Sequence, residues 1–305
     1  MLNFKTIFAV IVIVASHVVK AQSVTYSVKE DDSKSPNLMI NASLVDFNMG
    51  MPTLSLGCGA DADLYMGRFS FEGNFHVTYW DGKKSIMKGT NESLNKLKNY
   101  SSFRLGGRFH LMDKAGTHKM KANVSTEYIT GGTITHYIPM KVPCRSIIAL
   151  HFGLEHYNTV VKSKRDAIIT AKDGTKLSEW QSGTNLKVTM LYGGFSFVKI
   201  MKTKMTSGGD TWNFNWYRHI YIDALFAPLM NVQNIMTGTQ SYVVQGTGTT
   251  GFEKSAIGAR FGMNMVSKGK MSVRYEIGIL PGLAGRGFFT QASFGIPIVK
   301  HIKLK

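Results

Sequence analysis

Charged side chains and histidines recur at every second position in several stretches of the sequence, where they alternate with large apolar side chains. In the stretch from Arg68 to Trp80, RFSFEGNFHVTYW, the phenylalanines share one parity, while Glu72 and His76 share the other with Arg68. Alternate side chains of a β-strand point to opposite faces, so this pattern predicts one apolar and one polar face. The same pattern in other stretches predicts that twelve side chains line a shared polar interior: Arg68, Glu72, Arg104, Arg108, His110, Lys121, Glu127, His151, Glu155, Arg260, Arg274 and Glu276.

Two kinds of chemistry suit such an interior. The charges can pair across neighbouring strands and close the space, as they do in small barrels. Alternatively, the arginines can line a narrow path that favours anions. Barrels of about 12 strands lie between filled barrels and open porins, so size alone does not choose between the two.

Catalysis is the third kind of chemistry considered. The sequence contains no G-x-S-x-G elbow, no H-E-x-x-H motif and no Cys/His spacing typical of a metal site. A hydrolase at the rim of a barrel would need a histidine together with serine or aspartate at one end. His76, His110 and His151 lie on polar faces, but the sequence places no such partners beside them. We therefore expect no enzyme, no catalytic residue, no metal and no cofactor.

The strands that position these side chains are long. At roughly 3.3 Å per residue, Arg68 to Trp80 reaches about 40 Å, enough to cross a bilayer at a tilt of about 45°. Similar alternation predicts an all-β, antiparallel transmembrane β-barrel of about 12 strands, with about 10 to 14 compatible. The expected strands are 38–47, 53–61, 68–80, from 102, from 117, from 145, 162–171, 186–197, within 205–226, 255–266, 271–280 and 288–298.

The connections fall into two length classes. Short turns are expected at Asp113–Gly116 and Ser267–Lys270, and longer connections at 81–101, 130–144 and 228–252. Outer-membrane barrels alternate short periplasmic turns with longer external loops, and an even strand number leaves both termini in the periplasm. The connection 81–101 is rich in lysine, which suits contact with anionic lipopolysaccharide or plain solvation.

The N-terminus has the features of a secretory signal peptide. Residues 1–21 combine Lys5, an apolar core and a small-residue site ending at Ala21, and the apolar run is too short for a membrane-spanning helix. We expect a periplasmic segment at 22–37, the barrel at 38–299 and a basic periplasmic tail at 300–305. The two cysteines, Cys58 and Cys144, are compatible with a disulfide or with free thiols. The net charge is +17, but the cations are spread along the chain, which argues against nucleic-acid binding.

Several stretches resemble a known group of proteins. The segments Leu191–Phe197 (LYGGFSF), Tyr221–Pro228 (YIDALFAP) and Tyr275–Gly282 (YEIGILPG) are similar to strands of uncharacterised outer-membrane β-barrel proteins of Bacteroidetes-type bacteria. The segment Phe294–Ile298 resembles their closing strand, and here a basic stretch, Val299–Lys305, follows it. The resemblance implies a barrel in the outer membrane of a Gram-negative cell, and it implies no particular activity.

Three functions stay open on the sequence. The first is a non-enzymatic outer-membrane barrel with a structural or partner-binding role, such as an accessory subunit of an envelope or secretion complex. The second is an anion-favouring channel for small solutes, and the third is a rim hydrolase acting on lipid or peptide. The expected partners are outer-membrane lipid, lipopolysaccharide and an envelope protein.

Overall fold

The computed structural model is an all-β structure. It describes residues 27–30, 37–49, 54–82, 98–162, 169–171, 174, 176–177, 183–207, 210–237, 240–243, 254–267, 270–283 and 287–303. The expected signal peptide lies outside the described residues. Within these ranges, the chain forms no helix long and apolar enough to cross a membrane.

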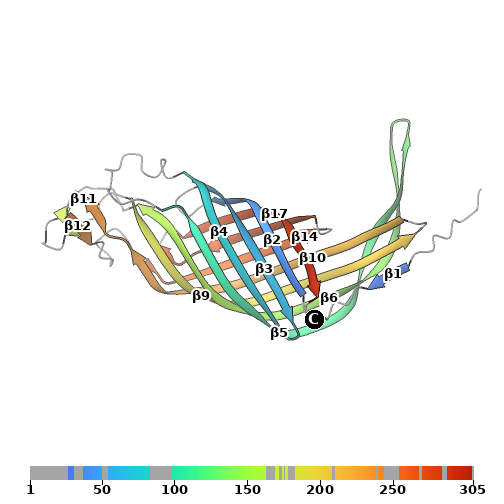
Figure 1. The fold of residues 1–305 in the computed structure, drawn as a ribbon, viewed down its shortest axis with the longest axis horizontal. Helices are drawn as coiled ribbons and strands as arrows, with labels where there is room; N and C mark the ends of the chain where they lie inside the picture. Colours follow the sequence, from blue (N-terminus) through green and yellow to red (C-terminus); the bar gives the residue numbers. More distant parts are fainter. Residues whose placement is uncertain are drawn as a thin grey trace, which may run out of the picture.

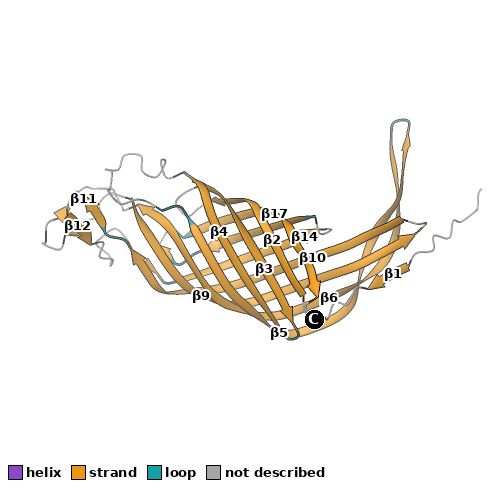
Figure 2. Ribbon diagram, viewed as in Figure 1, coloured by secondary structure: helices purple, strands orange, loops and turns teal. Residues whose placement is uncertain are grey.

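Ten antiparallel strands close into a barrel (Figures 1 and 2). The order around the wall is β9-β10-β14-β15-β17-β2-β3-β4-β5-β6, and pairing of β6 with β9 closes the ring. The wall strands are β2 (Asn37–Met49), β3 (Ser55–Met66), β4 (Phe69–Asp81), β5 (Ser101–Ile129), β6 (Gly132–Lys162), β9 (Gly183–Ser207), β10 (Asp210–Val232), β14 (Ile257–Ser267), β15 (Met271–Ile279) and β17 (Phe288–Lys303). The antiparallel barrel is thus confirmed, but its strand number is 10 and the expected number of 12 is wrong.

Two of the twelve predicted strands are absent as separate strands. The first of them depends on a turn predicted at Asp113–Gly116. This polar, glycine-containing segment reads as a turn by composition. In the structure β5 runs through it, because Lys114 pairs with Ser146 and Gly116 with Cys144 on β6. The chain instead reverses at residues 130–131, where Gly131 adopts a φ of 96° that favours glycine. The long connection expected at 130–144 is therefore part of β6.

The second of these strands was expected at 162–171. Here β6 ends at Lys162, residues 163–168 lie outside the described residues, and Ile169–Ala171 forms the short strand β7. It joins a small separate sheet with β8 (Lys176–Leu177), β11 (Ile235–Thr237) and β12 (Gln240–Val243). A further two-stranded pair joins β13 (Lys254–Ser255) to β16 (Gly282–Leu283). The short β7 cannot cross a bilayer, which takes about 9 residues.

Short and long connections alternate around the barrel. The pairs β3/β4, β5/β6, β9/β10 and β14/β15 are joined by two or three residues, while the links at 82–100, 163–182 and 233–256 are long. The predicted turn after Ser267 is present, with Lys270 donating its backbone N–H to the Ser267 carbonyl at 3.0 Å. We call the two ends of the barrel the short-turn end and the long-connection end. The small sheet containing β11 and β12 lies at the long-connection end (Figure 1).

Both ends of the chain meet the barrel at the short-turn end. The last strand, β17, pairs with β2 as far as Lys303, so most of the expected basic tail belongs to the closing strand. In the expected periplasmic segment, β1 (Ser27–Glu30) pairs with residues 203–206 of β9, beyond the pairing of β9 with β6. Cys58 and Cys144 are both free thiols.

The wall is apolar outside and polar inside. Large side chains that point outward are about half exposed, including Phe71 (52%), Leu105 (52%), Phe152 (49%) and Phe195 (50%). The alternate positions carry buried polar and charged side chains, among them Arg108 and Arg260 at 0–1% exposure. A water-soluble barrel would bury its apolar face, and exposed apolar areas of this extent mark an interaction surface. Of the aromatic residues near strand ends, Tyr79, Trp80 and Phe288 face outward, whereas Tyr217 and Phe289 are buried.

Paired glycines make room inside for large rings. Glu72, Gly106, Gly153 and Tyr192 form one register row across β4, β5, β6 and β9. The Tyr192 side chain lies over both glycines, since a Cβ on Gly106 or Gly153 would come within 1.9 or 2.5 Å of its hydroxyl oxygen. That hydroxyl reaches across two strands to donate to Glu72 at 2.9 Å. The glycine row therefore allows a side chain to bridge strands that are not neighbours.

The glycine row gives a first testable prediction. Gly153→Val should lower the free energy of unfolding by about 1–3 kcal/mol, because the added atoms collide with Tyr192 and with the backbone of β5. Urea titration of the folded barrel, followed by its heat-modifiable mobility, measures this change. Gly193→Val is the matched control, because a Cβ at Gly193 meets nothing within 4 Å. Equal stability of the two variants would contradict the packing role of Gly153.

Candidate functional site: the charged interior of the barrel

The barrel interior brings together nine of the twelve side chains selected from the sequence. Each is buried or partly buried on an inward-facing position, and together they come from five wall strands. They are Glu72 on β4, Arg104, Arg108 and His110 on β5, His151 and Glu155 on β6, Arg260 on β14, and Arg274 and Glu276 on β15.

The other three lie elsewhere. Arg68 is exposed in the turn between β3 and β4, because β4 begins one residue later than expected. Lys121 is exposed on the part of the β5/β6 hairpin that extends beyond the wall. Glu127 belongs to the same hairpin, paired with Ile134, and its side chain lies outside the described part of the structure. Register shifts in β5 after His110 and Asn123 interrupt the alternation, and the barrel wall ends before Lys121 and Glu127.

Arg104 lies at the centre of the interior and binds two glutamates. Its Nε donates to Glu155 Oε2 at 2.8 Å. Its Nη1 and Nη2 donate to the two oxygens of Glu276 at 2.8 and 3.1 Å. The latter is a bidentate pairing, the strongest arrangement available to an arginine and a carboxylate.

Arg260 and Arg274 extend this cluster in opposite directions. Arg260 donates from Nη1 to Glu155 at 2.6 Å and from Nη2 to Asp223 on β10 at 2.8 Å. Arg274 donates from Nη1 to Asp61 on β3 at 2.5 Å and from Nε to Glu276 at 2.9 Å. Each glutamate is thus shared between two arginines, so charges on non-adjacent strands are joined through the middle of the barrel.

His151 continues the network from Asp223 to β4. Its Nδ1 lies 2.7 Å from Asp223 Oδ1, and its Nε2 lies 2.7 Å from Glu72 Oε1. Carboxylate oxygens only accept hydrogen bonds, so both ring nitrogens donate and the ring carries a positive charge. The buried guanidinium of Arg108 forms a neighbouring group, bound to Asp63 and also donating to His219 Nδ1 at 3.2 Å.

Carboxylates outnumber arginines in this interior. The arginines are Arg104, Arg108, Arg260 and Arg274, whereas seven carboxylates share the space: Asp46, Asp61, Asp63, Glu72, Glu155, Asp223 and Glu276. His151 lies between two of these carboxylates and offsets part of the excess, and His76 contacts Asp46. The four aspartates were not selected from the sequence. Alternation with Ala62, Leu64, Ile222 and Ala224 was the signal that could have found three of them.

The wall formed by β17, β2 and β4 is polar in a different way. Several of its buried side-chain atoms have no hydrogen-bond partner in the protein: both amide atoms of Asn41, Asp46 Oδ1, Asn48 Nδ2, His76 Nε2, Gln291 Nε2 and Ser293 Oγ. Buried polar groups of this kind are usually satisfied by ordered water. This wall therefore has positions suited to isolated water molecules beside the buried contact of His76 with Asp46.

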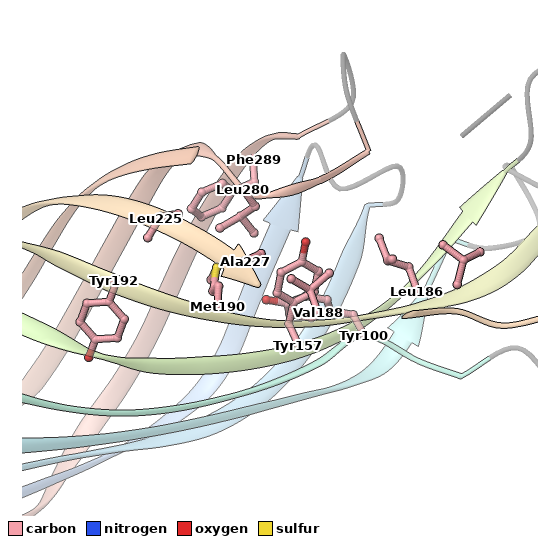
Figure 3. Packing of buried hydrophobic residues seen from close by; sticks show 11 residues of the cluster. Tyr100, Tyr157, Leu186, Val188, Met190, Tyr192, Leu225, Ala227, Leu280 and Phe289 are labelled. Atoms are coloured by element: carbon pink, nitrogen blue, oxygen red, sulfur yellow. The ribbon is translucent and has the colours of Figure 1, made fainter. Parts of the chain in front are cut away.

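Apolar clusters lie on both sides of the charged layer. At the long-connection end, Tyr100, Tyr157, Val188, Leu280 and Phe289 belong to a buried cluster (Figure 3). Toward the short-turn end, Tyr65, Ile147, Val198, Tyr217 and Val266 belong to a second one. Between them, a cavity lined by Asp61, Glu72, Arg104, Tyr221 and Arg274, among others, has a volume of only about 20 Å³. That volume holds about one water molecule.

Two groups of side chains were assessed for other chemistry. Candidate ligand atoms of Glu72, His151 and His219 lie within 4.8 Å of one another. Both nitrogens of His151 already face carboxylates, and His219 Nδ1 accepts from Arg108, which places a cation beside the group. His219 Nε2 is the one histidine nitrogen of the three residues that has no hydrogen-bond partner. Their geometry does not call for a metal ion.

The second group is a serine and histidine pair near the short-turn end. Ser70 Oγ lies 2.6 Å from His110 Nε2. His110 lines a cavity at this end together with Asp113, but its Nδ1 has no hydrogen-bond partner, so no carboxylate orients the ring. Ser70 is fully buried, so its hydroxyl is closed to a substrate. The pair therefore does not provide the constellation that a rim hydrolase requires.

Comparisons with known proteins add little to the geometry. No protein-family model matches the chain, and no curated protein matches it. Among solved structures, two mutant forms of a porin from Rh. blastica align over 91% of this chain and 100% of the porin at 8% identity, with TM-scores of 0.17 and 0.16. Scores this low carry no argument, so the barrel assignment rests on the strand pairing.

The charged layer gives a second prediction. Arg104→Leu should lower the free energy of unfolding by about 3–5 kcal/mol, because it leaves Glu155 and Glu276 buried with one fewer cation. Lys121→Leu also removes one cation from β5, but at an exposed position, and should leave stability nearly unchanged. Urea unfolding of both variants measures the difference. Similar losses in both variants would contradict the interior role of Arg104.

Proposed function

We propose that this protein is an outer-membrane β-barrel whose lumen is closed and whose role is structural or partner-binding. The observation that carries the proposal is the polarity of the wall, with exposed Phe71, Phe152 and Phe195 outside and paired charges inside. Lipid is the solvent that suits such an outer surface, and a closed barrel satisfies every backbone group within it.

A closed lumen is supported by the order of its layers. A small solute would have to pass the apolar cluster at one end, the ion-paired middle and the second apolar cluster. If any one of the interior arginines moves away from its partners, buried carboxylates are left without a counter-ion, which costs free energy. The barrel therefore serves better as a rigid scaffold than as an open path.

The anion-favouring channel receives less support. Carboxylates exceed arginines among the described interior side chains, so an opened path would attract cations in preference to anions. An enzymatic role also lacks a supporting site, because Ser70 is fully buried and the Nδ1 of its histidine partner makes no hydrogen bond to an acid. We thus infer a non-enzymatic scaffold that acts through its ends.

The proposed location is the outer membrane of a Gram-negative bacterium of the Bacteroidetes type, as the resemblance of the strand segments implies. The short-turn end, where β2 begins and β17 ends, then faces the periplasm. The long connections then face outward, and we propose the lysine-rich stretch within 82–100 as the contact with lipopolysaccharide because of its positive charge. An envelope protein that binds one of these two ends is the expected partner.

Single-channel recording tests the closed lumen. Refolded protein in a planar bilayer should show no steady conductance, because in the proposed closed lumen the two apolar clusters and the charged layer between them block the path. The double variant Arg104→Ala, Glu276→Ala removes the bidentate pair at the centre and should produce intermittent openings. Phe71→Ala, which changes the outer face, is the control and should stay silent.

The insertion itself is checked on the same samples. Heat-modifiable mobility and protection of the wall strands from protease establish that the barrel is folded in lipid. Steady, anion-selective conductance of the unmodified protein would overturn the closed-lumen proposal. Failure to insert into bilayers would overturn the membrane assignment.

A further inference from the structure

The β5/β6 hairpin continues well beyond the barrel wall. Pairing of β4 with β5 ends at Phe69 and Phe109, and pairing of β6 with β9 begins at Arg145 and Ile200, while β5 and β6 remain paired as far as Ile129 and Gly132. The outer part of the hairpin, which we call the ribbon, comprises 114–129 and 132–144. At the short-turn end it stands out to the side of the barrel body (Figure 1).

One face of the ribbon is attached to the barrel strands near its base. Met140, Val142 and Cys144 are buried in a cluster with Met201 of β9, and Met120 packs against the same cluster. His118, on this side, lies 3.0 Å from Lys199 Nζ. The base is therefore held in place by apolar contacts on one face, and the opposite face is left open.

The open face of the ribbon carries three lysines. Lys119 lies directly opposite Lys141 in the register, and Lys121 follows two positions along β5 on the same side. All three are exposed. Directly opposed like charges destabilise a β-ribbon, and none of the three forms an ion pair within the described chain. An anion between these lysines would remove the repulsion.

Two tyrosines continue the same face toward the tip. A register shift between Asn123 and Ser125 changes the phase of β5, so that Tyr128 pairs with Thr133 and shares the side of Tyr137 and Lys141. Tyr128 is 86% exposed and Tyr137 is 56% exposed. Lysine and tyrosine side chains combine an apolar body with a polar tip, the composition favoured at the surface of a bilayer.

We propose that this face of the ribbon, formed by Lys119, Lys121, Lys141, Tyr128 and Tyr137, binds the phosphates of anionic lipid headgroups. The inference rests on the membrane location proposed above. The ribbon leaves the barrel where the apolar wall ends, at the level of the headgroups, and extends to the side. Its lysines then meet phosphates while the tyrosine rings enter the interface. An acidic protein is the competing occupant of this face.

A fluorophore on the ribbon tests this contact. The chain would carry Cys58→Ser and Cys144→Ser, with Tyr137→Cys labelled by an environment-sensitive dye after insertion into vesicles. We expect a blue-shifted emission and quenching by headgroup-labelled lipid in vesicles with anionic phosphatidylglycerol, and much less of both in pure phosphatidylcholine. Lysine contacts of this kind contribute on the order of fivefold each to membrane binding, and salt screens them.

The lysine dependence separates specific contact from general charge. The triple variant Lys119→Gln, Lys121→Gln, Lys141→Gln should lose the difference between the two vesicle types. The matched control Arg68→Gln, Lys187→Gln, Lys270→Gln removes the same charge from three exposed positions outside the ribbon and should retain the difference. Contact in anionic vesicles should also fall at about 1 M salt, where screening acts over only about 3 Å.

Two failures are distinguishable. A barrel that inserts, by heat-modifiable mobility and protease protection, but whose dye responds equally to both vesicle types would overturn the lipid proposal alone. Recovery of the response on addition of an acidic protein in pure phosphatidylcholine would assign the face to that class of partner instead. A chain that does not insert would overturn the proposed membrane location as well.

Discussion

The arrangement of this barrel depends on the fact that an arginine buried in its interior stays protonated and therefore charged. Arg104, Arg108, Arg260 and Arg274 are almost fully buried, and each needs a carboxylate within reach. The partners come from across the barrel rather than from the next strand alone. A single connected path from Asp61 through Arg274, Glu276, Arg104, Glu155, Arg260, Asp223, His151 and Glu72 to Tyr192 links eight of the ten wall strands.

Such a network specifies geometry more than it adds stability. A well-packed apolar interior of equal volume would often be as stable, because burying charges costs nearly as much as pairing returns. A charged interior specifies one strand register more strictly, since any shift in register would separate the bidentate pair of Arg104 and Glu276. The glycine row contributes to the same specificity, because Tyr192 can reach Glu72 only where Gly106 and Gly153 have no side chains in its way. Outward positions accept many different apolar side chains, so they specify the strand register only weakly. The contacts in the interior must therefore specify it.

The sequence predicted most of the wall but not the way the interior is joined. Period-2 alternation identified β4, β14 and β15 and assigned inward and outward faces there, because the outward side chains are apolar and the inward ones are polar. It failed at Asp113–Gly116, where turn-like residues lie in a strand that a partner strand holds extended. It also missed Asp61 and Asp63, which stand among small residues in GCGADADLYM. Pairs such as Arg104 with Glu276 depend on barrel closure and strand number, which no local pattern contains.

The distribution of charge follows from the same constraint. The chain carries a formal charge of +17, yet its described interior holds more carboxylates than arginines. The excess of cations must therefore lie outside the lumen, and the outer wall is apolar where it is described. Lys114, Lys119, Lys121 and Lys141 show one place where they gather, on a hairpin beyond the wall. The unbalanced positive charge thus lies outside the described interior, and part of it is carried by this hairpin at the short-turn end.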